Sequence, residues 1–338
     1  MSTDKKKVGF DVLSVGDVVT DAFIKLFDDR AQSYQTDQGL ILAMPFGTKI
    51  PFDYSEVLPA VGNASNAAVN FAKLGLSSGL ISNVGGDVYG REIISTLDKK
   101  DVDTRFVKIH PKKKSNYHYV LWYKEERTIL INHEDYSYHW PHLRDHEKPE
   151  WVYFSSVSKS ALDFHDEMIE SLERHPDIKL AFQPGTFQME MGAQRLEHVY
   201  KRSELVAVNR EEAVFITGGN YDDLHDLIDR MHNLGPKIVV ISDGPRGSYA
   251  SDGNNRYQMP VYPDPAPPKE RTGAGDAFTS TFVAAIMKGN TIEGALQWAP
   301  ITSMNVVQHV GAQEGLLTER QISELLEKAP DWYKPKRM

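Results

Sequence analysis

The sequence predicts an α/β fold with a mostly parallel sheet. Short apolar runs of strand length alternate with stretches of helical periodicity along most of the chain. Because helices that connect successive strands leave those strands parallel, this alternation indicates a layered sheet covered by helices. A chain of 338 residues is long for a single core, so we expect one large domain with an accessory element, or two domains.

The expected elements follow one another in a regular order. A strand over residues 8–15 precedes Asp17 and Asp21, which stand at its carboxyl end, where open α/β sheets bind ligands. The motif Val61-Gly62-Asn63-Ala64-Ser65-Asn66 opens a helix that stops at Gly75. Further strands are expected at 80–84, 152–155, 179–183, 205–208 and 237–242, and further helices at 89–98, 161–173, 211–217, 221–233, 277–289, 291–309 and 319–328.

Two stretches interrupt the alternation. Residues 24–59 look irregular and are too long for a plain loop in a compact domain, so we expect an accessory or functional element there. Residues 116–132 predict a β-hairpin with a polar turn, and both of its faces are apolar or aromatic. Both faces therefore need cover. We expect one to close over a ligand and the other to pair with a second copy of the chain in a homodimer.

The composition argues against several classes of function. The net charge of -9 gives no basic surface for nucleic acid, and the absence of cysteine excludes disulfides and thiolate metal sites. No apolar run approaches the ~18 residues of a membrane-spanning helix. Residues 1–7 are not followed by the apolar segment of a secretory signal. We therefore expect a cytoplasmic protein without membrane or nucleic-acid partners.

Familiar cofactor motifs are absent from the sequence. There is no Gly-Lys dipeptide and hence no Walker A loop, and residues 85–90 miss the dinucleotide fingerprint because Asp87 takes its third position. No His-Glu-x-x-His occurs. A group of histidines lies close in sequence, but its irregular spacing and Pro141 favour a solvated loop over a metal site; the group is His133, His139, His142 and His146.

The segment Arg271-Thr272-Gly273-Ala274-Gly275-Asp276 is the strongest candidate for chemistry. It predicts a turn of small residues that leads into an apolar helix, so that backbone N–H groups at the helix start are uncovered. Such a helix N-terminus binds anions, phosphate above all. Asp276 would repel that phosphate, and its position therefore suggests a task such as accepting the proton of an attacking hydroxyl. The alternative is an ordinary acidic partner for the helix dipole.

Further candidates lie where predicted strands end. Asn209 and Glu212 follow the strand 205–208, where they either hold a hydrated Mg²⁺ ion or cap the next helix. Residues 239–247 form a buried strand with a glycine-rich turn, which suits a backbone close to a nucleotide and equally a plain hairpin. Gly311 and Ala312 follow a long predicted helix.

Together these motifs resemble the PfkB family of carbohydrate kinases, which has the ribokinase-like fold. The family's carboxyl-terminal signature, Gly-Ala-Gly-Asp before a helix, matches residues 273–276 with nothing missing. In its amino-terminal signature Val61 replaces the first glycine, and the matching residues are Gly62, Asn66, Leu74-Gly75 and residues 86–90. The family's Asn-x-x-Glu motif corresponds to Asn209 and Glu212.

The resemblance implies a three-layer α/β/α sandwich over residues 1–338, with a small β-sheet lid from about residues 24–60 and 112–135. It implies transfer of the γ-phosphoryl group of ATP to a primary hydroxyl of a sugar or sugar-like substrate. Asp276 would be the general base, and the N–H groups of Gly273, Ala274 and Gly275 would form the anion hole.

The resemblance also implies the binding residues. The substrate would contact Asp21, Gly62, Asn63 and Asn66. The nucleotide would lie against Asn209, Ser242, Gly244, Gly247 and Gly311. Asn209 and Glu212 would orient Mg²⁺ through water, and Glu270 and Thr272 stand where the family binds a monovalent cation. The expected cofactors are therefore ATP and Mg²⁺, with K⁺ as a further candidate.

The chain departs from ribokinase itself at the sugar site. Val19 stands where ribokinase has an asparagine, and no carboxylate lies near residues 154–156. An aromatic, less polar site could suit a nucleoside or a modified sugar. The alternatives left open are a nucleoside kinase of the adenosine-kinase kind and a family member that binds sugar or nucleotide without turnover.

Overall fold

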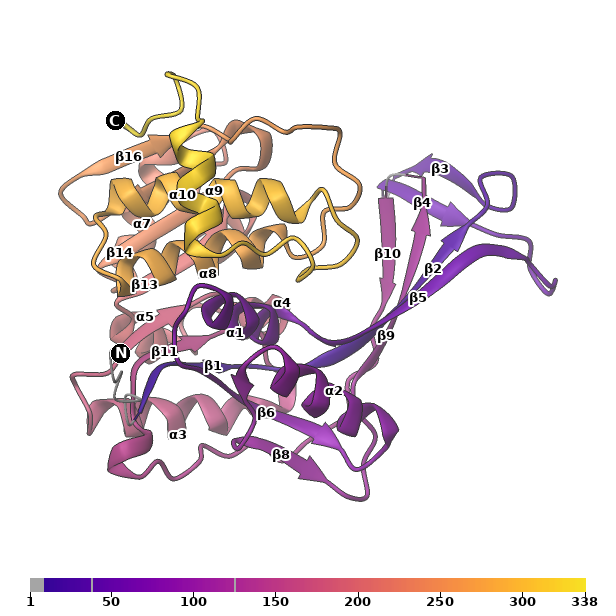
Figure 1. The fold of residues 1–338 in the computed structure, drawn as a ribbon, viewed down its shortest axis with the longest axis horizontal. Coiled ribbons are helices and arrows are strands. Elements are labelled where there is room, and N and C mark those ends of the chain that lie inside the picture. Colours follow the sequence, from indigo (N-terminus) through magenta and orange to yellow (C-terminus); the bar gives the residue numbers. More distant parts are fainter. Residues whose placement is uncertain (1–8, 38, 125) are drawn as a thin grey trace, which may run out of the picture.

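A computed structural model describes residues 9–37, 39–124 and 126–338 of the protein. Residues 1–8, which include the start of the first expected strand and the segment weighed as a signal, lie outside these ranges. Within the described residues, no helix combines the length and the apolar character needed to cross a membrane. The chain forms a layered body from which a narrow sheet extends to one side (Figure 1).

A central sheet of eleven strands organises the described residues. Its strands are β1 (Phe10–Val15), β6 (Ser78–Gly85), β7 (Val102–Asp103), β8 (Val107–His110), β11 (Pro149–Phe154), β12 (Lys179–Phe182), β13 (Leu205–Asn209), β14 (Ile238–Ser242), β15 (Ser248–Ser251), β16 (Arg256–Met259) and β17 (Lys336–Arg337). They run in the order β17-β16-β15-β14-β13-β12-β11-β1-β6-β7, and β8 also pairs with β6. Pairing is parallel from β7 through β14 and antiparallel from β14 to β17. The predicted, mostly parallel sheet is thus confirmed.

Helices cover both faces of this sheet because its strands are apolar on both sides. Successive residues of β11 show this, since Tyr153 packs into one core and Phe154 into the other. The helices against the first core are α1 (Asn63–Lys73), α8 (Ala274–Met287), α9 (Ile292–Val306) and α10 (Glu319–Glu327), with α2 (Val88–Lys99) beside α1. Those against the second are α3 (Leu162–Glu173), α5 (Glu197–Arg202), α6 (Arg210–Thr217) and α7 (Leu224–Asn233). The architecture is the expected three-layer sandwich (Figure 1).

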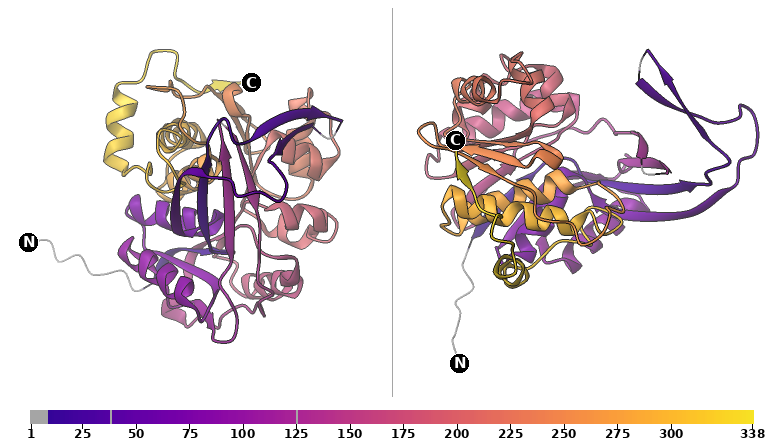
Figure 2. Two further views of the ribbon diagram at one scale, coloured as in Figure 1. Left: turned by 90° about the vertical axis from the view of Figure 1, so that its right-hand side faces the viewer. Right: turned by 90° about the horizontal axis from the view of Figure 1, so that it is seen from above.

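A second sheet of four strands projects from the sandwich, as the right view of Figure 2 shows. Its order is β10-β9-β2-β5, with β2 (Val19–Leu26), β5 (Phe52–Val61), β9 (Tyr117–Tyr123) and β10 (Glu126–Leu130). A separate hairpin, β3 (Gln32–Thr36) and β4 (Gly39–Ala43), lies at its far end (Figure 1). We call these six strands the projecting sheet.

The expectation that residues 24–59 are irregular is wrong, because most of them belong to strands. A strand can be recognised from alternating apolar and polar residues only when one of its faces is buried and the other faces water. Residues 52–57 of β5 are instead all exposed, and β3 is exposed along nearly its whole length. Without a buried face there is no alternation of apolar and polar residues for the sequence to display. The hairpin predicted at 116–132 is confirmed as β9 and β10.

Candidate active site

Asp276 lies in the first turn of α8, where three side-chain amides hold its carboxylate. Asn63 Nδ2 donates to Oδ1 at 2.8 Å, and Asn66 Nδ2 donates to Oδ2 at 2.8 Å. Gln183 Nε2 also donates to Oδ1, at 3.2 Å. Asn63 and Asn66 come from the first turns of α1, and Gln183 follows β12. Two segments far from α8 in sequence, the start of α1 and the residue after β12, therefore fix both oxygens of one carboxylate.

Asp276 is only 8% exposed, and this burial has the largest effect on the pKa of its carboxyl group. Burial raises the pKa of this carboxyl above its ordinary value, and the hydrogen bonds from Asn66, Asn63 and Gln183 lower it by less. The buried position makes the carboxylate a stronger base than an exposed aspartate.

The turn before Asp276 has a geometry that requires glycine. Gly273 caps α8 with φ 76°, and a Cβ atom there would stand 2.2 Å from the Cβ of Ala312. The Ala274 N–H donates to the Arg271 carbonyl at 3.3 Å. A Cβ on Gly275 would meet only open space, so the helix N-terminus is accessible there. The three residues expected to form an anion hole thus share one turn, although the N–H of Ala274 is partly engaged.

A cavity of about 290 Å³ opens beside this turn. Its wall joins Ala274 and Gly275 to the turn that follows β14 and to apolar residues of α9; it includes Ser242, Gly244, Pro245, Gly247, Ser248, Arg271, Phe278, Pro300 and Met304. Three of the residues predicted to bind nucleotide, Ser242, Gly244 and Gly247, therefore face the start of α8 across one cavity. Gly311 is not part of this wall, because it packs against Leu58 at the base of the projecting sheet.

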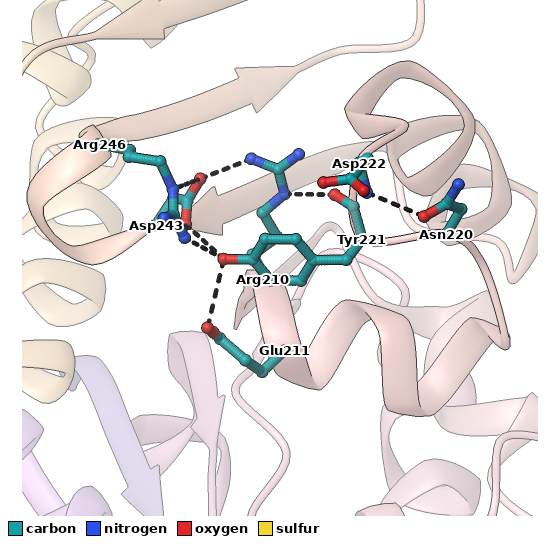
Figure 3. A network of polar contacts seen from close by, with 7 residues as sticks. All are labelled: Arg210, Glu211, Asn220, Tyr221, Asp222, Asp243 and Arg246. Carbon is teal, nitrogen blue, oxygen red and sulfur yellow. Dashed lines mark hydrogen bonds and ion pairs between the residues drawn. The ribbon is translucent and has the colours of Figure 1, made fainter.

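The turn after β14 is held by a buried carboxylate, Asp243 (Figure 3). Arg210 Nη1 donates to Asp243 Oδ2 at 2.7 Å, and Arg246 Nη2 donates to Oδ1 at 2.6 Å. The Arg210 guanidinium also lies over the Tyr221 ring, 4.5 Å from its centroid. Burial alone would raise the pKa of Asp243, but the bonds from both arginines outweigh it and keep the pKa low. The network fixes the backbone that lines the cavity.

Asn209 and Glu212 form a capping box at the start of α6. Asn209 Oδ1 accepts from the Glu212 N–H at 2.7 Å, and Glu212 Oε2 accepts from the Asn209 N–H at 2.8 Å. Burial raises the pKa of Glu212, and the negative charge of Asp276 adds to that rise. Glu212 makes no ion pair with a lysine or arginine of the described chain. A divalent cation between Glu212 and Asp276 would relieve their repulsion, so these residues fit Mg²⁺ while they also cap the helix.

Glu270 and Thr272, the candidates for a monovalent-cation site, do lie together. The N–H and the hydroxyl of Thr272 both donate to Glu270 Oε1. The same oxygen lies 3.1 Å from Nη1 of Arg127, which comes from β10 of the projecting sheet. Glu270 Oε2 is buried and has no hydrogen-bond partner among the described residues. An arginine of the projecting sheet thus neutralises a carboxylate six residues before Asp276.

On the opposite side of Asp276, the carboxyl ends of adjacent parallel strands bring further polar side chains together. Asp17 follows β1, and its N–H donates to the carbonyl of Ser156, which follows β11. Gly62, the cap of α1, has φ 113°, and a Cβ there would stand 2.9 Å from the Asp17 carbonyl. Asp21 lies on β2. Of the predicted residues, Gly62 therefore adjoins Asp17, and Asn63 and Asn66 contact Asp276.

Two histidines that were not predicted as site residues contact these aspartates. His118 Nδ1 lies 3.3 Å from Asp21 Oδ1, and His133 Nδ1 lies 3.2 Å from Asp17 Oδ2. The prediction that His133 lies in a solvated loop is wrong, because its side chain is only 15% exposed. His139 is 63% exposed, as that prediction requires. Gln183 was also missed, and no local motif marks any of these three contacts.

Comparison with known proteins identifies relatives of this arrangement. A family model described as pfkB family carbohydrate kinase matches residues 57–319. A ribokinase from Bacillus subtilis is 26% identical over 270 residues, which cover 78% of this chain and 87% of that protein. An ATP-dependent 6-phosphofructokinase from Thermoanaerobacterium thermosaccharolyticum is 22% identical over 326 residues, 91% of each chain.

The fold has close structural counterparts. The solved structure of Arabidopsis thaliana ribokinase complexed with ribose and ATP superimposes with a TM-score of 0.75 at 18% sequence identity. The match covers 94% of this chain and 99% of that one. The similarity supports the fold across nearly the whole chain.

Proposed function

Because this chain belongs to the pfkB family of carbohydrate kinases, we propose that it transfers the γ-phosphoryl group of ATP to a primary hydroxyl of a sugar-like acceptor, with Asp276 as the general base. The position of Asp276 carries the proposal. Its neighbours Ala274 and Gly275 line the 290 Å³ cavity, and its carboxylate is bonded to amides of α1 and to Gln183 on the other side. One carboxylate thus adjoins a nucleotide-sized cavity and a polar cluster suited to hydroxyls.

In this mechanism the acceptor hydroxyl gives its proton to Asp276 as its oxygen forms a bond to the γ-phosphorus of ATP, while the bond from that phosphorus to the β,γ-bridging oxygen breaks and ADP leaves. The three amide donors hold the carboxylate in place before the acceptor arrives, so little reorganisation is needed at the moment of transfer. The N-terminus of α8 favours negative charge on the transferred group. When bound, ATP would supply the phosphoryl group and Mg²⁺ would neutralise part of its charge. Asn209 and Glu212 would hold Mg²⁺, and Ser242, Gly244 and Gly247 would hold the nucleotide.

An ADP-release screen over pentoses, hexoses, keto-sugar acids and nucleosides tests this function. We expect ADP release to rise above the acceptor-free rate with at least one class, and to require both Mg²⁺ and Asp276. A background rate with every class would contradict the proposal and favour a binding protein without turnover.

We propose that the projecting sheet, including the segments 24–60 and 112–135, acts as the lid and joins two copies of the chain. It carries large apolar side chains that the single chain leaves exposed, among them Tyr54, Val57, Tyr119, Leu130 and Ile131. Light scattering should give the mass of a dimer, and Leu130→Glu should reduce it to that of a monomer. Phe215→Glu is the matched control, because Phe215 is equally exposed but lies on α6, outside the sheet. A monomeric wild-type protein would contradict the proposal.

K⁺ remains a proposed activator at Glu270 and Thr272, where it would compete with Arg127 for the same carboxylate. Rates in potassium chloride and in tetramethylammonium chloride at equal ionic strength test this, because only K⁺ is small enough to bind. Equal rates would remove K⁺ from the mechanism and leave Arg127 as the charge partner of Glu270.

A further inference from the structure

Two aspartate–histidine pairs lie side by side near the start of α1, the helix whose Asn63 and Asn66 hold Asp276, and the proton transfer does not use them. His118 stands beside Asp21, and His133 is hydrogen-bonded to Asp17. The two imidazoles are stacked, with centroids 5.1 Å apart and planes 23° apart. They come from β9 and from the loop after β10, so the projecting sheet and its return loop deliver both rings. We call Asp17, Asp21, His118, His133 and Asp276 the acceptor cluster.

Contacts link both pairs to the reacting carboxylate. His133 packs edge-on against Phe187 of α4 (Thr186–Met191), with centroids 5.8 Å apart. That helix begins three residues after Gln183, which donates to Asp276. Asp17 lies against Gly62, the cap of the helix whose Asn63 and Asn66 also hold Asp276. The pairs and the proposed base therefore share the same supporting elements.

Both pairs leave ring atoms available. Asp17 is fully engaged, because Oδ1 accepts from the Tyr138 hydroxyl at 2.6 Å and Oδ2 faces His133. In the neutral tautomer that carries its proton on Nδ1, His133 donates a hydrogen bond to Asp17, and its Nε2 atom can accept another hydrogen bond. His118 Nε2 and Asp21 Oδ1 are buried and have no hydrogen-bond partner in the described chain. Buried polar atoms without partners are costly, and a ligand that donates hydrogen bonds would satisfy them.

The charge of the acceptor cluster disfavours anions. Its three carboxylates outnumber its two imidazoles, so the cluster would carry a net charge of about −1 even with both rings protonated. No lysine or arginine of the described residues forms an ion pair with Asp17, Asp21 or Asp276. Lys159 lies over the Phe187 ring, which contacts His133, but its ammonium group is paired with Glu190 at 2.6 Å. Carboxylate and phosphate groups are typically bound by arginine forks or lysines, and the cluster offers neither.

We infer that the phosphoryl acceptor is a polyhydroxy compound without anionic groups, whose hydroxyl groups are bound by the Asp21–His118 and Asp17–His133 pairs. The inference rests on the proposed kinase function and narrows its substrate class. Neutral sugars, polyols and the ribose of a nucleoside belong to this class because they offer neighbouring O–H donors. Sugar acids and sugar phosphates fall outside it.

Matched acceptors test the charge rule directly. ADP release is measured for fructose against fructose 6-phosphate and for glucose against gluconate, with a set of nucleosides alongside. The neutral member of each active pair should be preferred at least about tenfold in kcat/KM, the effect of one lost or repelled polar contact. Preference for a charged member would overturn the inference but keep the kinase function. A background rate with every acceptor would overturn both.

Variants test the residues once a neutral acceptor is found. His118→Asn and His133→Asn should each raise KM for the acceptor about tenfold and leave KM for ATP within about twofold. His139→Asn is the matched control, because it is exposed and bonded to Glu167 away from the cluster. Thermal unfolding with and without acceptor gives a second readout, since both cluster variants should keep the Tm of the free protein but lose the acceptor-induced rise. Unchanged KM values and an unchanged rise would overturn the inference.

Discussion

The two sides of Asp276 are built from different parts of the chain. The nucleotide side is mostly backbone: a glycine turn at the start of α8, a second turn after β14, and the Asp243 network that fixes it. The acceptor side is mostly side chains, and they arrive from β2, β9, the loop after β10, α1 and β12. The nucleotide side can bind a phosphate chain through backbone N–H groups, which do not depend on the neighbouring side chains. The ligand preference of the acceptor side depends instead on which side chains are present.

This difference separates what the fold shares from what this chain adds. A backbone turn offers the same N–H groups in any kinase that needs a phosphate site. The fold itself does not dictate the side chains of the acceptor side, because β2 and β9 can keep their strand geometry with other residues at these positions. Substitutions on the two sides should therefore have separable effects on nucleotide and acceptor, with Asp276 as the point where they meet.

The largest effect is expected at that point. Asp276→Asn removes the base but keeps the size and most hydrogen bonds of the side chain, so kcat should fall about 10³-fold. ATP should still raise the Tm of the variant, because the cavity wall is unchanged. Turnover within a few-fold of the wild type would show that another group accepts the proton.

On the nucleotide side, Arg210→Met should cost stability. The Arg210 side chain is 11% exposed and the Asp243 side chain 1%, so the variant leaves a buried carboxylate with one charge partner fewer, at a cost of about 2 kcal/mol. Arg246→Met is the comparison, and it should cost clearly less because the Arg246 side chain is 58% exposed. Urea unfolding of both variants measures the difference. Equal losses would mean that burial does not decide the strength of this network.

Between the two sides, Arg127→Gln tests the contact of the projecting sheet with Glu270. The variant leaves the Glu270 charge buried without its cation and loosens the segment that leads into the glycine turn, so kcat should fall about tenfold. K⁺ should restore part of the loss, which a merely structural role of Arg127 would not predict. Glu126→Gln, at the exposed neighbouring position, serves as the control. A normal rate for Arg127→Gln would mean that Glu270 does not need this partner.

The same contrast explains how much could be predicted from sequence. The parallel sheet, most of its strands and helices, and the turn at Gly273 follow from local patterns, because each is encoded within a dozen consecutive residues. The placement of Ser242, Gly244 and Gly247 at the nucleotide followed instead from the resemblance to the PfkB family, because the local pattern there suits a plain hairpin equally well.

The acceptor side was harder to predict because its contacts join distant residues. His118 lies 97 positions from Asp21 and His133 lies 116 positions from Asp17, and no spacing rule links either pair. Gln183 reaches Asp276 across 93 positions. The strands of residues 24–59 escaped prediction for another reason, since both faces of β3 and much of β5 are exposed and carry no alternation.

The pH dependence of kcat/KM tests most directly whether Asp276 is the base. Burial raises the pKa of Asp276, and only the ionised carboxylate accepts a proton, so kcat/KM should fall as the pH drops through that raised pKa. The Asn63 amide stabilises the ionised form, so Asn63→Ala should move the acidic limb of the profile up by about one pH unit. Asn220→Ala, an exposed change on the nucleotide side, should leave the limb in place. An acidic limb at the same pH in Asn63→Ala and in the wild type would contradict the assignment of Asp276 as the base.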